Sequence, residues 1–271
     1  MIDYGHAYCE ATGKPAPTQA PRLTPLFQQI AAGTLLPPRG QQAVDLGLTA
    51  HSLNDPREDP PLYEYYQWVL AHYFAEQPPH ELTAKLIGMA FTCANLFQTD
   101  LPQPLTINPW QVESLTTFPL ATRRAIVVEN NGIFIWLFKR HPTWPLINQA
   151  GNDFNPTYVQ LLQELEQRGL QLTYLGDLDS RGIQMADYLF QQLQKTSIEQ
   201  FTALQTPTQV ATWLAVHGKS DLKRQRTRRL TVQQPVFQTE MDSVCLLHQF
   251  VEQEQLIADY ERLMPAWLDE A

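Results

Sequence analysis

The sequence predicts an α/β fold, in which a mainly parallel sheet is flanked by helices and preceded by a small, mostly α-helical region. From about residue 121 onward, apolar runs with β-branched residues alternate with amphipathic segments, which is typical of right-handed βαβ units. Before that point the helical periodicity is interrupted by proline-rich turns. We therefore expect two parts, residues 1–115 and residues 116–271.

The first part carries helical periodicity in three places. Apolar residues recur at helical spacing over residues 23–33, where Gly33 would end the helix, and again over residues 62–76. A third helix is expected over residues 80–97, after the Pro78-Pro79 turn. Two helices joined by a proline-rich turn indicate a small all-α unit, and residues 99–119 read as a proline-rich connection.

The second part alternates strands and helices. The strand over residues 125–129 is bounded by Asn-Asn-Gly, and the clearest helix is closed by Gly169, because glycine readily adopts the left-handed conformation found at helix ends. The expected strands are 125–129, 144–151, 170–177 and 230–237, and the expected helices are 133–140, 156–169 and 180–194.

The net charge and the cysteine content exclude some classes of function. The net charge is −9, which excludes a uniformly basic nucleic-acid-binding coat, so nucleic-acid binding would need a local basic patch, a metal ion or a partner subunit. The three cysteines lie far apart, which argues against a disulfide framework and against a zinc site. No run of about 18 apolar residues occurs, as a membrane-spanning helix would need. We expect a cytoplasmic protein.

Three carboxylates follow the ends of predicted strands. Glu129 ends the first strand, Asp177 ends the third, and Asp179 follows two residues later. Ligands of open parallel sheets bind beyond the carboxyl ends of the strands, and three clustered negative charges repel one another unless a cation is present. The pattern therefore predicts a Mg²⁺ site, and Gly176 and Gly182 would allow a ligand to approach the backbone closely. The alternative is that Glu129 forms a salt bridge and Asp179 caps the next helix.

Six basic residues gather within eleven positions of this acidic chain. Clustered lysine and arginine neutralise phosphates, so this stretch is the candidate contact to a nucleic-acid backbone, the alternative being a solvated loop or a charged edge strand. Arg181 stands next to Asp179 at a helix N-terminus, where it could meet a phosphate or pair with Asp179. The six cluster residues are Lys219, Lys223, Arg224, Arg226, Arg228 and Arg229.

The stretches VVENNG and GDLDSRGI resemble the Toprim signature, in which a glutamate after one strand and an Asp-x-Asp pair after a later strand hold Mg²⁺. GDLDSRGI is most similar to the Toprim domain of the topoisomerase VI A-subunit. More narrowly, residues 125–193 resemble the C-terminal Toprim-like domain of the nuclease subunit of Wadjet-type defence systems, which are condensin-like bacterial complexes that cleave plasmid DNA. The resemblance is specific over residues 121–195 and loose elsewhere, and members of that family carry a longer N-terminal half.

The resemblance implies a Mg²⁺- or Mn²⁺-dependent DNA endonuclease with a Rossmann-like sheet, in which Glu129, Asp177 and Asp179 are the catalytic metal ligands. It also implies a late acidic residue, for which the stretch PVFQTEMDS offers Glu240, and next to it Asp242; an ordinary surface acid is the alternative. The implied partners are DNA, condensin-like SMC and kleisin-type subunits, and a second copy of the chain.

Two other functions stay open. A Toprim-like scaffold could bind DNA or a condensin-like ATPase without cleaving, which suits the acidic composition. The strand and Asp-x-Asp of LTYLGDLDS also resemble the start of a haloacid-dehalogenase-type phosphatase, although Arg181 stands where that family has threonine or valine. The tyrosines at positions 63, 65 and 66 could suggest a topoisomerase-like nucleophile, but their spacing favours the aromatic face of a core helix.

Overall fold

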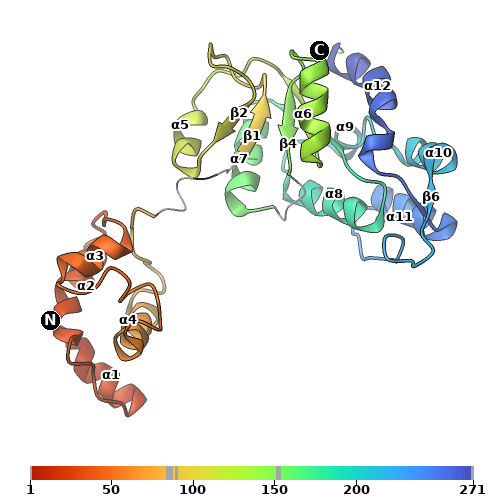
Figure 1. Ribbon diagram of the computed structural model, residues 1–271. Coiled ribbons are helices and arrows are strands. Elements are labelled where there is room, and N and C mark those ends of the chain that lie inside the picture. The colour runs from red at the N-terminus through yellow and green to blue at the C-terminus, as the bar shows by residue number, and fades with distance from the viewer. Residues whose placement is uncertain (1, 84–87, 89–90, 151–153, 270–271) are drawn as a thin grey trace. The chain divides into compact units, whose positions relative to one another are not determined.

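The computed structural model describes residues 2–83, 88, 91–150 and 154–269, and the chain divides into two compact units, Met1–Ile87 and Gly88–Ala271 (Figure 1). This division differs from the expected one at residues 115/116. Residues 91–94 and 105–107 form two strands that pair into the sheet of the second unit.

The N-terminal unit is helical, as expected. Phe27 and Ile30 of the second helix pack with Tyr65 and Tyr66 of the fourth in one buried cluster, so these two tyrosines form part of a core face. The second helix stops at Ala31, and Gly33 follows it at a φ of +67°. The helices are α1 (Tyr4–Thr12), η1 (Ala20–Leu23), α2 (Thr24–Ala31), α3 (Arg39–Asp45) and α4 (Pro60–Tyr73).

The second unit is built on a five-stranded sheet with the order β2-β1-β4-β3-β5. Strand β3 is parallel to both of its neighbours, whereas β1 is antiparallel to β2 and β4. The strands are β1 (Phe91–Ala94), β2 (Leu105–Ile107), β3 (Arg124–Val128), β4 (Leu146–Asn148) and β5 (Gln171–Leu175). The sheet is therefore mixed but parallel where β3 pairs, and the predicted α/β class is confirmed.

The helix expected over residues 80–97 is wrong where the structure describes that stretch. Residues 91–94 form β1, and all four are buried, so a short apolar run of this kind does not distinguish strand from helix by periodicity. Residues 84–87 and 89–90 of the expected helix lie outside the described residues.

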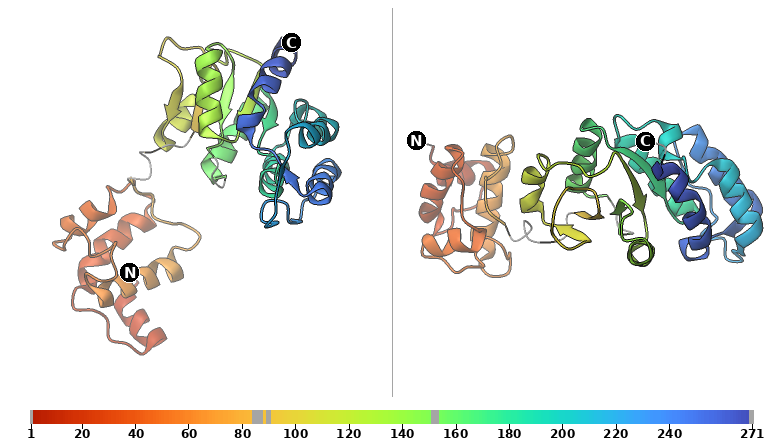
Figure 2. Two further views of the ribbon diagram at one scale, coloured as in Figure 1. Left: turned by 45° about the vertical axis from the view of Figure 1, so that its right-hand side comes forward. Right: turned by 90° about the horizontal axis from the view of Figure 1, so that it is seen from above.

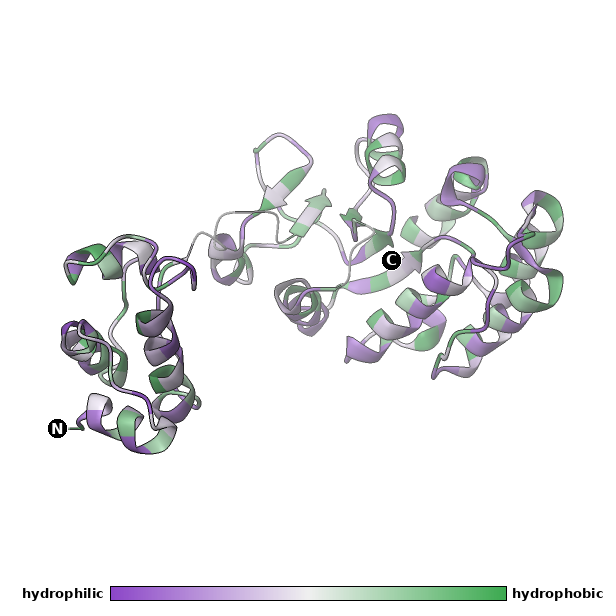
Figure 3. Ribbon diagram, turned by 60° about the horizontal axis from the view of Figure 1, so that its bottom comes forward, coloured by the Kyte–Doolittle hydropathy of each residue, from purple (hydrophilic) through white to green (hydrophobic). Residues whose placement is uncertain are grey.

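Helices cover both faces of the sheet (Figure 2). Helices α6 (Asn131–Arg140) and α12 (Ile257–Asp269) lie on one face, and α7 (Pro156–Gln167) and α8 (Ser180–Gln192) lie on the other. Hydrophobic and hydrophilic bands alternate along these helices in Figure 3, as expected for helices with one buried side. The helices predicted over residues 133–140, 156–169 and 180–194 are confirmed as α6, α7 and α8, with small differences at their ends.

The C-terminal segments bring distant residues to the sheet's carboxyl edge. Strands β6 (Lys219–Ser220) and β7 (Gln249–Phe250) form an antiparallel ladder, and Leu178 forms a bridge with Val251. These pairings place the loop after β6 and the turn after β7 beside the end of β5. The remaining elements are η3 (Pro109–Gln111), α5 (Val112–Leu115), α9 (Ile198–Phe201), α10 (Pro207–His217), α11 (Pro235–Leu247) and η4 (Gln253–Gln255).

The strand expected over residues 230–237 is wrong. Residues 230–234 are irregular, and α11 begins at Pro235, a residue suited to the first helical turn because it needs no N–H partner there. The buried Asp187 carboxylate of α8 accepts hydrogen bonds from the N–H groups of Gln233 (2.8 Å) and Gln234 (2.9 Å). This carboxylate therefore holds the start of α11 against α8. No helix in the described part of the chain is long and apolar enough to cross a membrane.

Candidate functional site

The ends of β3 and β5 bring Glu129 and Asp177 together. Val128 and Leu175 are paired in the parallel register, so the residues that follow them leave the sheet at the same edge. Glu129 Oε2 accepts hydrogen bonds from the backbone N–H of Asp177 (3.1 Å) and from the hydroxyl of Tyr174 (3.2 Å). The two predicted strand-end acids therefore share one site.

In both Asp177 and Asp179, one carboxylate oxygen accepts hydrogen bonds from backbone N–H groups, and the other faces the side chain of Arg226. Asp177 Oδ1 accepts from the N–H of Gln253 at 2.9 Å, and Asp179 Oδ1 accepts from the N–H groups of Arg181 (2.9 Å) and Gly182 (2.8 Å) at the start of α8. Both remaining oxygens face the guanidinium of Arg226. Asp179 is thus a helix cap and a member of the acidic cluster at once.

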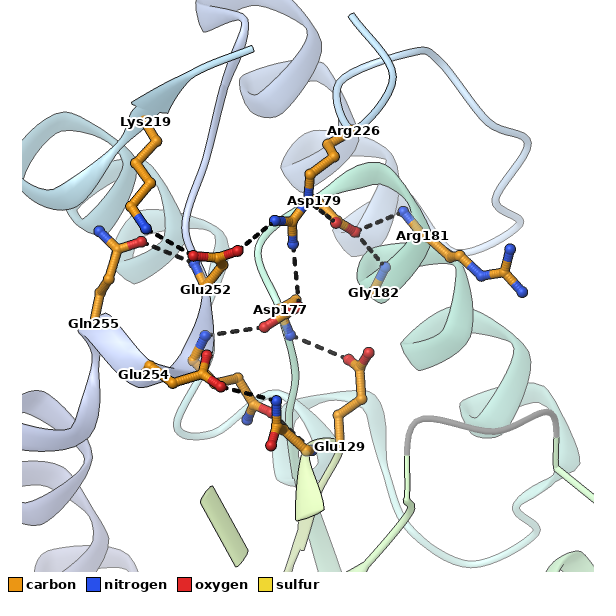
Figure 4. Close-up of polar contacts among 12 residues, drawn as sticks. Glu129, Asp177, Asp179, Arg181, Gly182, Lys219, Arg226, Glu252, Glu254 and Gln255 are labelled. Carbon is orange, nitrogen blue, oxygen red and sulfur yellow. Dashed lines mark hydrogen bonds and ion pairs between the residues drawn. The ribbon is translucent and has the colours of Figure 1, made fainter. Parts of the chain in front are cut away.

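Arg226 binds three carboxylates (Figure 4). Its Nη2 lies 3.2 Å from Asp177 Oδ2, its Nε lies 2.8 Å from Asp179 Oδ2, and its Nη1 lies 2.7 Å from Glu252 Oε1. The guanidinium also lies 4.1 Å from the centre of the Phe250 ring, a cation–π contact. The second oxygen of Glu252 pairs with Lys219 at 2.7 Å.

The backbone around Arg226 is held in place. The Asp221 carboxylate accepts from the N–H groups of Arg226 (2.7 Å) and Thr227 (2.9 Å), and the carbonyl of Arg226 accepts from the N–H of Ser180 (2.8 Å). The position from which the arginine side chain extends is therefore set by the fold.

The site concentrates negative charge in partly buried surroundings. Burial, and next the charge of Asp177, raise the pKa of Glu129 to about 7. Burial also raises the pKa of Asp177, although Arg226 and the hydrogen bond from Gln253 oppose this. Hydrogen bonds from Lys219 and Arg226 lower the pKa of Glu252. Within this site, Glu129 and Asp177 are thus the acids whose ionisation burial opposes.

Gly176 and Gly182 serve the protein's own close contacts. A Cβ atom at Gly176 would lie 2.5 Å from Glu129 Oε2, and one at Gly182 would lie 2.2 Å from the carbonyl oxygen of Asp177. The sequence alone suggests that these glycines leave room for a ligand. In the structure, Gly176 leaves room for the carboxylate of Glu129, and Gly182 leaves room for the backbone of Asp177.

The donor chemistry fits a hard divalent cation, although an arginine holds the oxygens that would bind it. Carboxylate oxygens are the ligands that Mg²⁺ and Mn²⁺ prefer, and burial together with the neighbouring charge of Asp177 raises the pKa of Glu129. Within the residues that the structure describes, no group of three or more histidine, cysteine, aspartate or glutamate side chains is already arranged to hold a metal ion. The site as it stands holds a guanidinium.

Glu240 lies elsewhere, on α11. Its side chain is fully buried, and neither carboxylate oxygen has a hydrogen-bond partner in the described part of the chain. The described contacts include none between it and Glu129 or the aspartate pair. Asp242, on the same helix, is exposed and pairs with Arg229 at 2.6 Å. The structure therefore does not join Glu240 to the acidic cluster.

The predicted basic residues divide into two groups. Lys219, Arg226 and Arg229 are engaged with carboxylates, whereas Lys223, Arg224 and Arg228 are exposed and have no ion pair among the described residues. Arg181 contacts Asp179 through its backbone N–H, and its guanidinium points away from the cluster in Figure 4.

Sequence reasoning missed four residues that complete the site. Gln253 joins the two strand ends, because its side chain donates to the carbonyl of Leu175 (3.0 Å) and accepts from the N–H of Asn130 (3.0 Å). The only signal in the sequence is the acidic segment VEQEQ (251–255), far from the other acids along the chain. The missed residues are Tyr174, Glu252, Gln253 and Glu254, the last of which accepts from the Asn130 side chain at 3.0 Å.

A known protein family matches most of the second unit. The family profile described as "Protein of unknown function C-terminus (DUF2399)" matches residues 105–269. Comparison with curated proteins gives no match. The matched segment runs from β2 to α12, contains the whole acidic cluster with Arg226, and spans more than half of the 271 residues. The chain therefore belongs to the DUF2399 family.

Proposed function

We propose that the protein is a Mg²⁺-dependent DNA phosphodiesterase, a nuclease that acts within a condensin-like plasmid-defence complex. The observation that carries the proposal is the meeting of Glu129 with the Asp177/Asp179 turn at the carboxyl ends of two adjacent parallel strands. The resemblance of this segment to Toprim domains supports the nuclease assignment and the condensin-like partners.

Glu129, Asp177 and Asp179 would hold the metal ion. A bound Mg²⁺ would polarise the phosphodiester and lower the pKa of a coordinated water. The chain's own groups keep the ligands in position: the N–H of Gln253 orients Asp177, the first turn of α8 orients Asp179, and Tyr174 orients Glu129.

The exposed cations of the loop after β6 would contact the DNA backbone. Lys223, Arg224 and Arg228 lie in the same loop as Arg226, which reaches the acidic cluster. Their charges have no carboxylate partner among the described residues, so they are available to phosphates.

A non-catalytic binding subunit is the second candidate. The observation that favours it is that Arg226 occupies the aspartate pair and that the described residues offer no ready metal site. Such a subunit would use the basic loop to bind DNA and the acidic cluster only to hold its loops together.

Cleavage of supercoiled plasmid by the chain together with its partner subunits tests the proposal. We expect cleavage with Mg²⁺ or Mn²⁺, none with EDTA, and a loss of about a hundredfold or more in Asp177→Asn, as for removal of a group that stabilises the transition state. Glu76→Ala is the matched acidic control, because Glu76 is exposed and lies in the N-terminal unit.

Undiminished cleavage by Asp177→Asn would contradict the proposal. DNA binding without metal-dependent cleavage by the assembled complex would favour the binding subunit instead.

A further inference from the structure

We propose that Arg226 is a built-in competitor of the divalent cation: its guanidinium and the metal ion exclude each other at Asp177 and Asp179, and Glu252 keeps the displaced guanidinium nearby. The proposal rests on the proposed function in one respect, since it takes these aspartates as metal ligands. It adds that the chain itself sets how readily the metal binds.

The aspartate oxygens that are not committed to backbone N–H groups are those that Arg226 occupies. One oxygen of each aspartate is committed to backbone N–H groups, of Gln253 in one case and of α8 in the other. The other two, Asp177 Oδ2 and Asp179 Oδ2, are the ones that face Arg226, at 3.2 and 2.8 Å. A cation bound to the same oxygens at about 2.1 Å would stand next to a positively charged group. Charge repulsion and lack of space therefore make the two occupants exclusive.

The guanidinium of Arg226 also has contacts that do not involve the aspartates. Its Nη1 already donates to Glu252 at 2.7 Å, and its face lies on the Phe250 ring. The backbone of Arg226 is fixed by Asp221 and by the N–H of Ser180, so the side chain moves and the loop need not. Release from the aspartates would thus leave two of the present contacts intact.

The competition has a clear physical consequence. Without metal, Arg226 neutralises acids that would otherwise repel one another at the edge of the sheet. With metal, the divalent ion supplies the positive charge instead. The affinity for metal is therefore lowered by the free energy needed to detach the guanidinium from the two aspartates.

Mn²⁺ binding to the full-length chain, measured by titration calorimetry and by the electron paramagnetic resonance signal of free Mn²⁺, tests the proposal. We expect Arg226→Gln to bind Mn²⁺ about tenfold more tightly than the wild type, a change of about 1.4 kcal/mol. Arg226→Lys, which cannot bridge three carboxylates, should lie between the two. Arg229→Gln removes the same charge from the same segment but faces Asp242, so its affinity should stay within about twofold of the wild type.

Unchanged or weaker Mn²⁺ binding by Arg226→Gln would overturn the proposal, since it would mean that Arg226 only positions the acids. Thermal unfolding supplies a readout that does not depend on cleavage. Arg226→Gln should unfold at a lower temperature than the wild type in EDTA and should gain more from Mn²⁺. An equal gain in the two proteins would count against the competition.

The Asp177→Asn variant separates this proposal from the proposed function. If it binds Mn²⁺ as tightly as the wild type, the ligand assignment fails and the competition fails with it. If it loses Mn²⁺ binding and cleavage while Arg226→Gln gains no affinity, the nuclease assignment stands and only the competition is refuted.

Discussion

The backbone N–H of Asp177 donates a hydrogen bond to Glu129 Oε2 across 3.1 Å, so that the end of β5 holds the side chain at the end of β3. Through this contact, the backbone after β5 holds the Glu129 side chain in place. It also keeps a carboxylate in partly buried surroundings next to a second carboxylate, which is the origin of its raised pKa.

Glu129→Gln should stabilise the metal-free protein in a pH-dependent way. The folded-state pKa of Glu129 is about 7, above its ordinary value of 4.5. The wild type therefore loses stability relative to the variant as pH rises from about 4.5 to 7, because the unfolded chain releases a proton that the folded chain keeps. Above pH 7 the variant should be more stable by up to about 3 kcal/mol, at about 1.4 kcal/mol per pKa unit.

Urea denaturation in EDTA, repeated at several pH values, measures this difference. A difference that stays constant with pH would contradict the titration of Glu129. Added Mn²⁺ should stabilise the wild type more than the variant, since the ion favours the ionised carboxylate.

Glu240 should make the protein less stable in alkaline than in acidic solution. Burial raises the pKa of Glu240 well above its ordinary value of 4.5. Above about pH 4.5 the folded chain keeps the proton that the unfolded chain loses, so this residue lowers stability by about 1.4 kcal/mol per pH unit until the folded pKa is reached.

Two variants separate charge from hydrogen bonding at this position. Glu240→Gln removes the titration and should flatten the pH dependence of the free energy of unfolding. Glu240→Met also removes the unpaired polar atoms, and it should be more stable than the glutamine variant at every pH. Parallel pH profiles for the wild type and the glutamine variant would show that Glu240 does not titrate as argued.

Gly182→Ala should destabilise the second unit and disturb the acidic site. The added Cβ would lie 2.2 Å from the carbonyl oxygen of Asp177, which is backbone and cannot move aside cheaply. We expect a loss of about 1–3 kcal/mol in the free energy of unfolding, as for an overpacked core.

Gly132→Ala is the matched control, because this glycine is also in the first turn of a helix beside the site. Its Cβ would lie 3.1 Å from Oδ1 of Asn130, a side-chain atom that would need to shift by only a few tenths of an ångström. Equal effects of the two substitutions on the denaturation midpoint would contradict the role of close packing at Gly182.

Replacing Lys223, Arg224 and Arg228 together by glutamine should weaken DNA binding and reduce its salt dependence. Each cation that neutralises a phosphate contributes about −0.9 to the slope of log K against log salt concentration. Fluorescence anisotropy with a labelled duplex at several salt concentrations measures that slope.

Arg229→Gln should change the salt slope little, because Arg229 is already paired with Asp242. An unchanged slope in the triple variant would show that these three cations do not contact the DNA backbone.

The candidate site was predictable where its residues lie next to recognisable strands. Glu129 and Asp177 follow apolar runs that become β3 and β5, and the rule that ligands gather at the carboxyl ends of parallel strands led to the same edge. The role of Arg226 was not predictable, because six basic residues in one stretch look alike in the sequence. The bridge between Leu178 and Val251 and the β6–β7 ladder bring the segment to the end of β5, and the ion pairs show that Arg226 reaches the aspartates.

The α/β alternation after residue 121 and the acids at the strand ends could be predicted from the sequence, because periodicity and position next to a strand are local properties of the chain. Long-range packing sets three further features: Phe91–Ala94 is a strand of the same sheet, Glu240 is buried on α11, and Arg226 pairs with Glu252 and both aspartates. These outcomes depend on pairings between segments far apart in sequence, whose free energy comes from packing and hydrogen bonds that no local pattern contains.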